Sequence, residues 1–222
     1  MNSRMKGYYR DRAIVETVGK YRCLNTEQIQ YLIFPGMKSG RRKCQQRLKK
    51  LTNRGKLKRW RYDLEEPYAY FINRIEQIDH VILLNWFLIW QCSNPRTWGD
   101  KLQSFSYEQD YDILRADAFV IYRNTLSGSY TFSFVEMDRT ENVFDKVKKY
   151  NELYASGKYL NSWWKRLAKG FPSIHIVTTN TRRLRLIQDA IKHSNKHGLE
   201  FKAYLISDVK KEVLCCGSSL VN

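Results

Sequence analysis

The sequence has few of the residue patterns that build a metal centre, a cofactor site or a membrane span. Its five cysteines include no CxxC pair, its four histidines form no ligand cluster, and its 11 glycines form no phosphate-binding loop. No Ser-His-Asp order indicates a hydrolase, and the longest apolar run, Val81 to Trp90, is too short to cross a membrane. The opening stretch is polar and basic rather than a signal peptide, so we expect a soluble cytoplasmic protein with reduced cysteines.

Acidic residues are also absent from one stretch of the chain. Residues 38–61 hold 12 lysines and arginines and no aspartate or glutamate, whereas residues 62–110 hold 8 acids and 3 bases. The whole chain carries a net charge of +17. A charge run is often only a solvated surface, but this density of like charge exceeds what solubility needs. We therefore expect a polyanionic partner, double-stranded DNA, and no membrane.

Two short helices are predicted before this basic stretch. Ile14 and Val18 have helical spacing within a first helix over Asp11–Cys23. Asn25 with Gln28 three positions later forms a capping-box pattern, which predicts the start of a second helix that ends before Pro35.

A third helix is predicted over Ser39–Asn53, with Gly55 as its stop signal. Cys44, Leu48 and Leu51 form its apolar face. The opposite face is predicted to bind DNA, with Arg42 and Gln46 best suited to read base edges. The predicted DNA-binding residues of this helix are Arg41, Arg42, Lys43, Gln45, Gln46, Lys49 and Lys50.

Two strand-like runs, LKRWRY and AYFIN, follow this helix and are joined by the turn DLEEP. Lys58, Arg59 and Arg61 on the first run are predicted to contact DNA phosphates. Three short helices followed by a basic hairpin is the order of a winged helix-turn-helix. We assign this domain to residues 1–75.

Residues 76–222 are predicted to form a second, mixed-sheet α/β domain, which makes the chain α+β. An apolar helix begins near Asp79, and a short strand over Phe105–Glu108 precedes the strand-like runs ILRADAFVIY and SYTFSFVEMD. A helix over Asn142–Ser156 follows, with Val143, Val147 and Tyr150 predicted to share one face. The remaining elements are the strand SIHIVTT, the helix RRLRLIQDAIKHS and the closing strand EFKAYLIS.

Three carboxylates fall on two of these strands, which are expected to be neighbours. Glu136 and Asp138 are two residues apart and so share a face, and Asp117 lies on the preceding strand. Three clustered carboxylates repel one another unless a cation or basic groups neutralise them, and a divalent cation makes Asp117, Glu136 and Asp138 predicted ligands of Mg2+ or Mn2+. The alternative is a structural ion-pair cluster of Asp117 and Asp138 with Arg139.

This domain resembles the PD-(D/E)xK nuclease fold, in which an aspartate, a glutamate and a lysine surround the metal. The resemblance implies catalytic roles for Asp117 and Glu136. Asp138 stands where the lysine is expected, which weakens the case for catalysis, and Lys146 or Lys149 of the following helix would have to replace it.

The chain as a whole resembles the replication-relaxation family of plasmids, integrative elements and phages. The motifs that carry this resemblance are RDRAIVETVGKYRCLNTEQIQYLIFPG, RRKCQQRLKKLTNRGKLKRW, RADAFVIY, FVEMDRTE, KVKKYNELY and IHIVTTNTRR. It implies a DNA-binding role in replication or in DNA relaxation and mobilisation, with other replication or relaxosome proteins as further partners. A homodimer is left open.

Two functions therefore follow from the sequence: a double-stranded DNA-binding protein of a mobile element, and alternatively a metal-dependent DNA endonuclease or nickase. The adjacent Trp163 and Trp164, beside Lys165 and Arg166, have two interpretations of their own. They either stack on nucleic-acid bases or fill the core.

Overall fold

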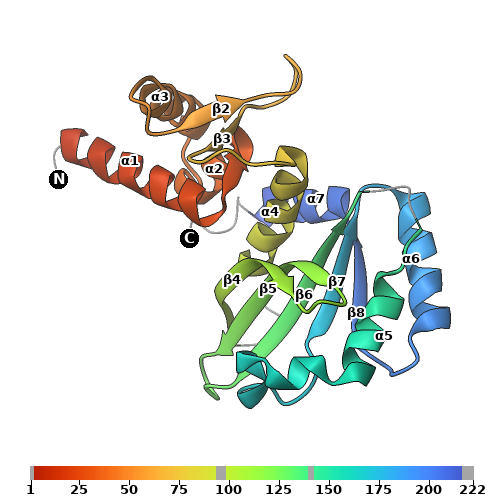
Figure 1. The fold of residues 1–222 in the computed structure, drawn as a ribbon. Helices are drawn as coiled ribbons and strands as arrows, with labels where there is room; N and C mark the ends of the chain where they lie inside the picture. Colours follow the sequence, from red (N-terminus) through yellow and green to blue (C-terminus); the bar gives the residue numbers. More distant parts are fainter. Residues whose placement is uncertain (1–2, 94–98, 140–142, 217–222) are drawn as a thin grey trace. The chain divides into compact units, whose positions relative to one another are not determined.

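The computed structural model describes residues 3–93, 99–139 and 143–216 (Figure 1). The chain divides into two compact units, Met1–Trp86 with Lys211–Asn222, and Phe87–Lys210.

The first unit contains the helices α1 (Ser3–Lys20), α2 (Thr26–Ile33) and α3 (Gly40–Asn53). Its antiparallel sheet has the order β1-β3-β2, formed by β1 (Cys23–Asn25), β2 (Lys58–Trp60) and β3 (Ala69–Phe71). The predicted hairpin of β2 and β3 is confirmed, because Arg59 pairs with Tyr70. Each of the three helices buries apolar residues, and Ile14, Ile29 and Leu48 are fully buried.

The predicted start of the second helix and end of the third are confirmed in detail. The Asn25 side chain accepts a hydrogen bond from the backbone N–H of Gln28, and the Gln28 side chain accepts one from the backbone of Asn25. Gly55 takes a left-handed φ of +66°, and the following Lys56 N–H donates to the Leu51 carbonyl at 3.0 Å.

The prediction that the first helix continues to Cys23 is wrong. α1 ends at Lys20, the backbone turns through a left-handed φ of 61° at Arg22, and Cys23 pairs with Phe71 of β3. Pairing with a strand nearly 50 residues later in the chain overrides the helical spacing of the preceding residues.

The two units divide inside α4 (Ile78–Ser93). Two polar contacts attach the first half of this helix to the first unit. Asn85 is buried and donates to the carbonyls of Tyr21 and Cys23 at 2.9 and 2.5 Å, and the Gln28 amide donates to the Ile82 carbonyl at 2.8 Å. The second half begins at Phe87, whose ring lies 5.6 Å from His175 in the second unit.

The second unit is built on a five-stranded mixed sheet with the order β4-β5-β6-β7-β8. The first three strands form an antiparallel meander: β4 (Asp100–Asp110), β5 (Arg115–Asn124) and β6 (Tyr130–Asp138). β7 (Ser173–Thr178) and β8 (Phe201–Leu205) continue the sheet in parallel. The mixed sheet and the α+β class are confirmed, although β4 is longer than the predicted Phe105–Glu108.

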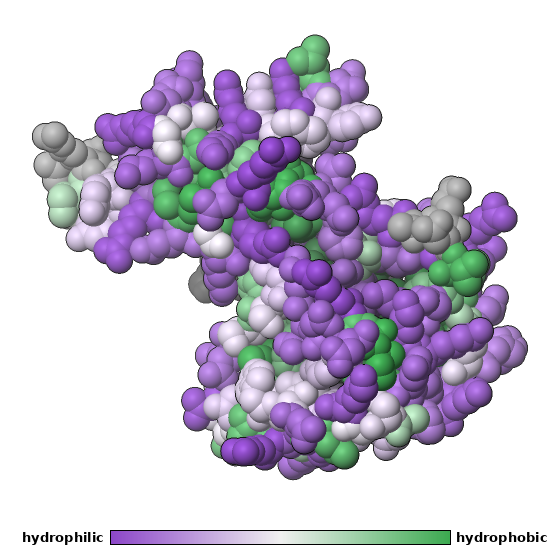
Figure 2. Space-filling model, viewed as in Figure 1, coloured by the Kyte–Doolittle hydropathy of each residue, from purple (hydrophilic) through white to green (hydrophobic). Residues whose placement is uncertain are grey.

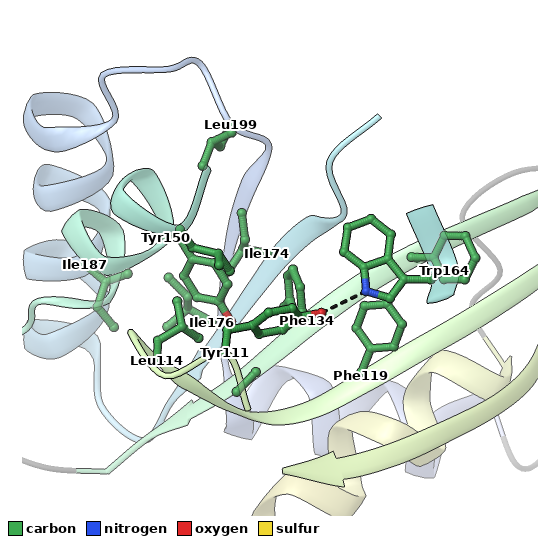
Figure 3. Packing of buried hydrophobic residues seen from close by; sticks show 13 residues of the cluster. Tyr111, Leu114, Phe119, Phe134, Tyr150, Trp164, Ile174, Ile176, Ile187 and Leu199 are labelled. Carbon is green, nitrogen blue, oxygen red and sulfur yellow. Dashed lines mark hydrogen bonds between the residues drawn. The ribbon is translucent and has the colours of Figure 1, made fainter. Parts of the chain in front are cut away.

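One face of this sheet packs against α5 (Lys146–Ser156), α6 (Thr181–Ser194) and two short 3-10 helices (Figures 1 and 3). Phe134, Ile174 and Ile176 from the strands meet Tyr150 and Ile187 from the helices in one core. Asp117, Glu136 and Asp138 belong to this same face, because each lies an even number of residues from a core phenylalanine of its own strand.

Two predictions at helix boundaries in this unit need correction. Val143 is 92% exposed, because α5 begins only at Lys146, so it does not share the buried face of Val147 and Tyr150. The predicted first residue of that helix, Asn142, lies outside the described residues. The chain does not close on a strand either, since α7 (Ile206–Cys216) follows β8 directly.

Candidate nucleic-acid interface and acidic site

α3 places its polar and basic side chains on one exposed face. Cys44, Leu48 and Leu51 are buried at i, i+4 and i+7, which turns the intervening residues outward. The structure thus brings together on exposed positions all seven residues predicted to bind DNA: Arg41, Arg42, Lys43, Gln45, Gln46, Lys49 and Lys50. The visible face of the first unit is largely hydrophilic (Figure 2).

Arg47 is the exception among the cations of α3. Its Nε donates to the Asp11 carboxylate at 2.6 Å, and its Nη2 donates to the Gly7 carbonyl at 2.5 Å. Both partners lie on α1, and the side chains of Arg47 and Asp11 are only 23% and 15% exposed. Arg47 therefore fixes α3 to α1, a role that the basic run in the sequence did not distinguish from that of its neighbours.

The hairpin presents a second set of cations. Lys58 and Arg59 are exposed on β2, and Arg61 is half-buried just after it. The guanidinium groups of Arg59 and Arg61 each lie 4.6 Å from the ring centroid of Tyr68, and Arg61 also donates to the Leu64 carbonyl at 3.1 Å. These contacts restrict both arginines before any ligand binds.

The turn between the two strands is acidic. Asp63, Glu65 and Glu66 are all exposed there, next to the basic strand. The hairpin therefore carries its cations along the first strand and its acids at the tip.

The acidic site of the second unit is centred on Glu136. The register that pairs Ala118 with Val135 places Asp117 opposite Glu136 on adjacent strands. Asp117 Oδ2 accepts a hydrogen bond from the backbone N–H of Met137 at 2.7 Å. The strands thus bring two of the three predicted carboxylates together.

Two side chains from α5 close over the Glu136 carboxylate. The Tyr150 hydroxyl donates to Oε1 at 2.7 Å, and the Lys146 ammonium lies 2.7 Å from Oε2, which has no other polar partner among the described residues. Lys146 and Tyr150 are four residues apart and so project from the same side of the helix. Lys149, the other predicted lysine, pairs with Asp145 at 2.8 Å instead.

Burial dominates the electrostatics of this site. Glu136 is 1% exposed, and loss of hydration raises its pKa to about 7, although the Lys146 charge opposes that rise. Burial alone would lower the pKa of Lys146, but the attraction of Glu136 and Asp117 outweighs it, so the pKa of Lys146 is raised. The pKa of Tyr150 is raised well above its usual value, first by burial and then by Glu136, so its hydroxyl stays protonated and can donate.

Asp138 is held by a different partner. The Nε and Nη2 atoms of Arg183 in α6 donate to its two carboxylate oxygens at 2.5 and 3.0 Å. Both side chains are about one-tenth exposed, and the Arg183 guanidinium also lies 5.6 Å from the Phe144 ring centroid. The ion-pair interpretation named Arg139, but the arginine in this fork is 45 residues along the chain from Asp138.

The predicted metal ligands Asp117, Glu136 and Asp138 do not form a metal-binding set in this arrangement. Arg183 engages both oxygens of Asp138, while Tyr150 and Lys146 engage those of Glu136. Throughout residues 3–93, 99–139 and 143–216, no three histidine, cysteine, aspartate or glutamate side chains gather closely enough to hold a metal ion. What the site offers instead is a buried proton-binding carboxylate with a lysine beside it.

Sequence reasoning missed two residues that matter in these sites. The sequence predicts that Tyr150 shares a face with Val147, but no local pattern indicates that its hydroxyl meets Glu136. Arg183 gave no signal, because its pairing depends on how α6 packs against β6.

Within the described part of the chain, no helix is long and apolar enough to span a bilayer. Comparison of the chain with protein-family models, curated proteins and solved structures finds no match.

Proposed function

We propose that this protein binds double-stranded DNA through its first unit, with α3 as the recognition helix of a winged helix-turn-helix. The observation that carries the proposal is the exposed face of α3, where seven basic or amide side chains stand without a single acid. Arginine and glutamine at successive turns suit the guanine and adenine edges of the major groove.

The surroundings of α3 support this assignment. α2 ends at Ile33 and α3 begins at Gly40, so a short connection joins two helices ahead of a hairpin. Arg47 ties α3 to α1 from its inner side, which leaves the outer side rigid and free. Lys58, Arg59 and Arg61 are spaced along the hairpin for phosphate contacts beside the groove.

The biological role we propose is replication, or DNA relaxation and mobilisation, of a plasmid, integrative element or phage. This role rests on the motif resemblance to the replication-relaxation family, and a basic first unit followed by a unit with a mixed five-stranded sheet supports it. Cytoplasmic location and other replication or relaxosome proteins as partners belong to the same proposal.

Selection from a random duplex pool tests the proposal directly. The purified full chain should enrich one family of sites, and Arg42→Ala or Gln46→Ala should relax the preference at one base position at a cost of roughly 1–3 kcal/mol. Enrichment of no sequence, or an unchanged site in both variants, would contradict the recognition-helix assignment.

A second candidate function is metal-dependent DNA cleavage. One observation favours it: Lys146 reaches Glu136 from α5, beside Asp117, which supplies the lysine missing at Asp138. The Arg183–Asp138 fork and the burial of Glu136 oppose it. Nicking of supercoiled plasmid that requires Mg2+ or Mn2+ and is lost in Asp117→Asn would establish this function. No nicking with either ion would leave the second unit non-catalytic.

A further inference from the structure

The two adjacent tryptophans of the second unit have different environments. Trp164 is fully buried, and its indole Nε1 donates to the Tyr111 hydroxyl at 2.8 Å (Figure 3). Trp163 is 56% exposed, although the two residues lie in the same 3-10 helix, η2 (Trp163–Arg166). Trp164 therefore fills the core, as one of the two interpretations predicted, but Trp163 does not. The exposure of Trp163 needs another explanation.

The exposed indole of Trp163 is nevertheless held in place. Its ring centroid lies 6.4 Å from that of Phe119 and 6.0 Å from that of Phe132, both in edge-to-face geometry. Both phenylalanines belong to the buried core of the sheet. An aromatic side chain that is packed against the core yet more than half exposed loses little conformational entropy when a flat ligand stacks on it.

The chain around Trp163 is uniformly basic. From residue 153 to residue 188 it has seven lysines and arginines and no acid. Lys165, Arg166 and Lys169 lie within six residues of Trp163, and none of them forms an ion pair within the part of the chain that the structure describes. Lys158, by contrast, lies 3.4 Å from Asp112.

We propose that this Trp163 surface, formed by Trp163, Lys165, Arg166 and Lys169, binds single-stranded DNA. An unpaired base would stack on the indole, and the three cations would neutralise the neighbouring phosphates. The bases of a duplex already stack on one another, so the surface selects unpaired strands. The inference rests on the proposed function only in that DNA handled by the protein would supply the unpaired strands. The Trp163 surface itself belongs to the second unit, whereas α3 belongs to the first.

An anionic membrane is the competing partner, because Leu160 and Leu167 are also exposed near Trp163. The local structure disfavours it. The segment consists of two four-residue 3-10 helices, η1 (Lys158–Asn161) and η2, with the polar Asn161 and Ser162 between the exposed apolar residues. This gives no continuous apolar helix face of the kind that inserts into a bilayer surface.

The test measures the affinity of the full chain for a labelled oligo(dT) by fluorescence anisotropy. The background is the α3 variant with Arg42→Ala, Gln46→Ala and Lys49→Ala, which removes the proposed contribution of the first unit. Adding Trp163→Ala should weaken oligo(dT) binding by about 5- to 100-fold, the range for one lost stacking contact. Leu126→Ala, an equally exposed apolar side chain in the hairpin turn of the same unit, is the matched control and should change nothing.

Trp163→Phe covers the case in which the alanine variant does not fold, since it keeps an aromatic face on Phe119 and Phe132. Oligo(dT) should quench tryptophan fluorescence in the unmodified protein, and that quenching should disappear in Trp163→Phe while most of the affinity remains. Unchanged quenching in Trp163→Phe, or unchanged affinity in a folded Trp163→Ala, would overturn the proposal.

Further measurements distinguish single-stranded DNA from an anionic membrane as the partner of the Trp163 surface. Arg166→Gln with Lys169→Gln should lower oligo(dT) affinity and flatten its salt dependence, because fewer counterions are released. The fluorescence of Trp163 is also measured on addition of phosphatidylserine vesicles. If the vesicles quench it and oligo(dT) does not, the proposal is overturned in favour of a membrane. Trp163→Ala in a chain with an unmodified α3 should still bind duplex DNA although it loses affinity for oligo(dT). That result would show that the Trp163 surface and α3 act independently.

Discussion

The Lys146 ammonium lies 2.7 Å from the Oε2 atom of Glu136, so a lysine from α5 covers a carboxylate of β6 that is almost fully buried. This pair joins a helix to the sheet at the carboxylate that also accepts a hydrogen bond from Tyr150. Its behaviour shows whether the site is a structural link or the remainder of a catalytic centre.

Removing Lys146 should destabilise the second unit. In Lys146→Met the carboxylate of Glu136 keeps only Tyr150, and the loss of the partly exposed lysine should cost roughly 1–3 kcal/mol. Lys149→Met is the matched control, because its pair with Asp145 is exposed and contributes no more than about 0.5 kcal/mol. Urea unfolding at pH 8 measures both, and equal losses in the two variants would contradict the structural role of Lys146.

The raised pKa of Glu136 predicts a pH dependence of stability. An unfolded glutamate has a pKa of about 4.3, whereas the folded value is about 7, so between these values the folded state binds more protons than the unfolded one. Stability from this group is therefore lost as pH rises through that window. The free energy of unfolding of the unmodified protein, relative to Glu136→Gln, should fall between pH 5 and pH 8. A constant difference between the two proteins would refute the raised pKa.

Replacing Arg47 should mainly lower the stability of the protein, whereas replacing Arg42 should mainly lower its affinity for DNA. Arg47→Ala removes the link from α3 to Asp11 and Gly7 and should lower the free energy of unfolding by about 1–3 kcal/mol. Arg42→Ala removes an exposed side chain and should change stability by less than about 0.5 kcal/mol while weakening duplex binding. Thermal melting and DNA retardation of both variants check this, and the reverse pattern would mean that the outer face of α3 has been misassigned.

Salt should weaken duplex binding steeply. If α3 and the hairpin make about 6 to 10 phosphate contacts, the affinity should fall by roughly 10³- to 10⁵-fold between 50 and 200 mM salt. Lys58→Ala should reduce the slope of that dependence by about one unit and weaken all duplex sequences equally. A flat salt profile would exclude this mode of binding.

The elements that could be predicted from sequence were those set by local patterns. The capping box at Asn25, the apolar face of α3 and the β2–β3 hairpin each depend on residues within about a dozen positions of one another along the chain. The strand β1 could not be predicted in the same way, because three residues become a strand only when Phe71 is available to pair with Cys23. The division of the chain inside α4 likewise depends on where the Asn85 amide finds its carbonyl partners.

The acidic site shows the same limit. The alternation of residues along β6 correctly placed Glu136 and Asp138 on one face, but it carried no information about what would cover them. The Arg183 fork and the Tyr150 hydrogen bond come from helices that pack on the sheet, and they decide which carboxylate oxygens stay accessible. Charge and spacing therefore predicted where the carboxylates lie, but not which side chains cover and pair with them.

The central claim is that the outer face of α3 binds duplex DNA, and two triple variants of matched composition test it most directly. The first carries Arg42→Ala, Gln46→Ala and Lys49→Ala, and the second replaces an exposed Arg-Gln-Lys set on α6, Arg185→Ala, Gln188→Ala and Lys192→Ala. Both lose two positive charges and one amide from a helix surface. By fluorescence anisotropy with a labelled duplex, the α3 variant should lose at least about tenfold in affinity while the α6 variant keeps that of the unmodified protein. Equal losses in both, or an unchanged α3 variant, would contradict the account.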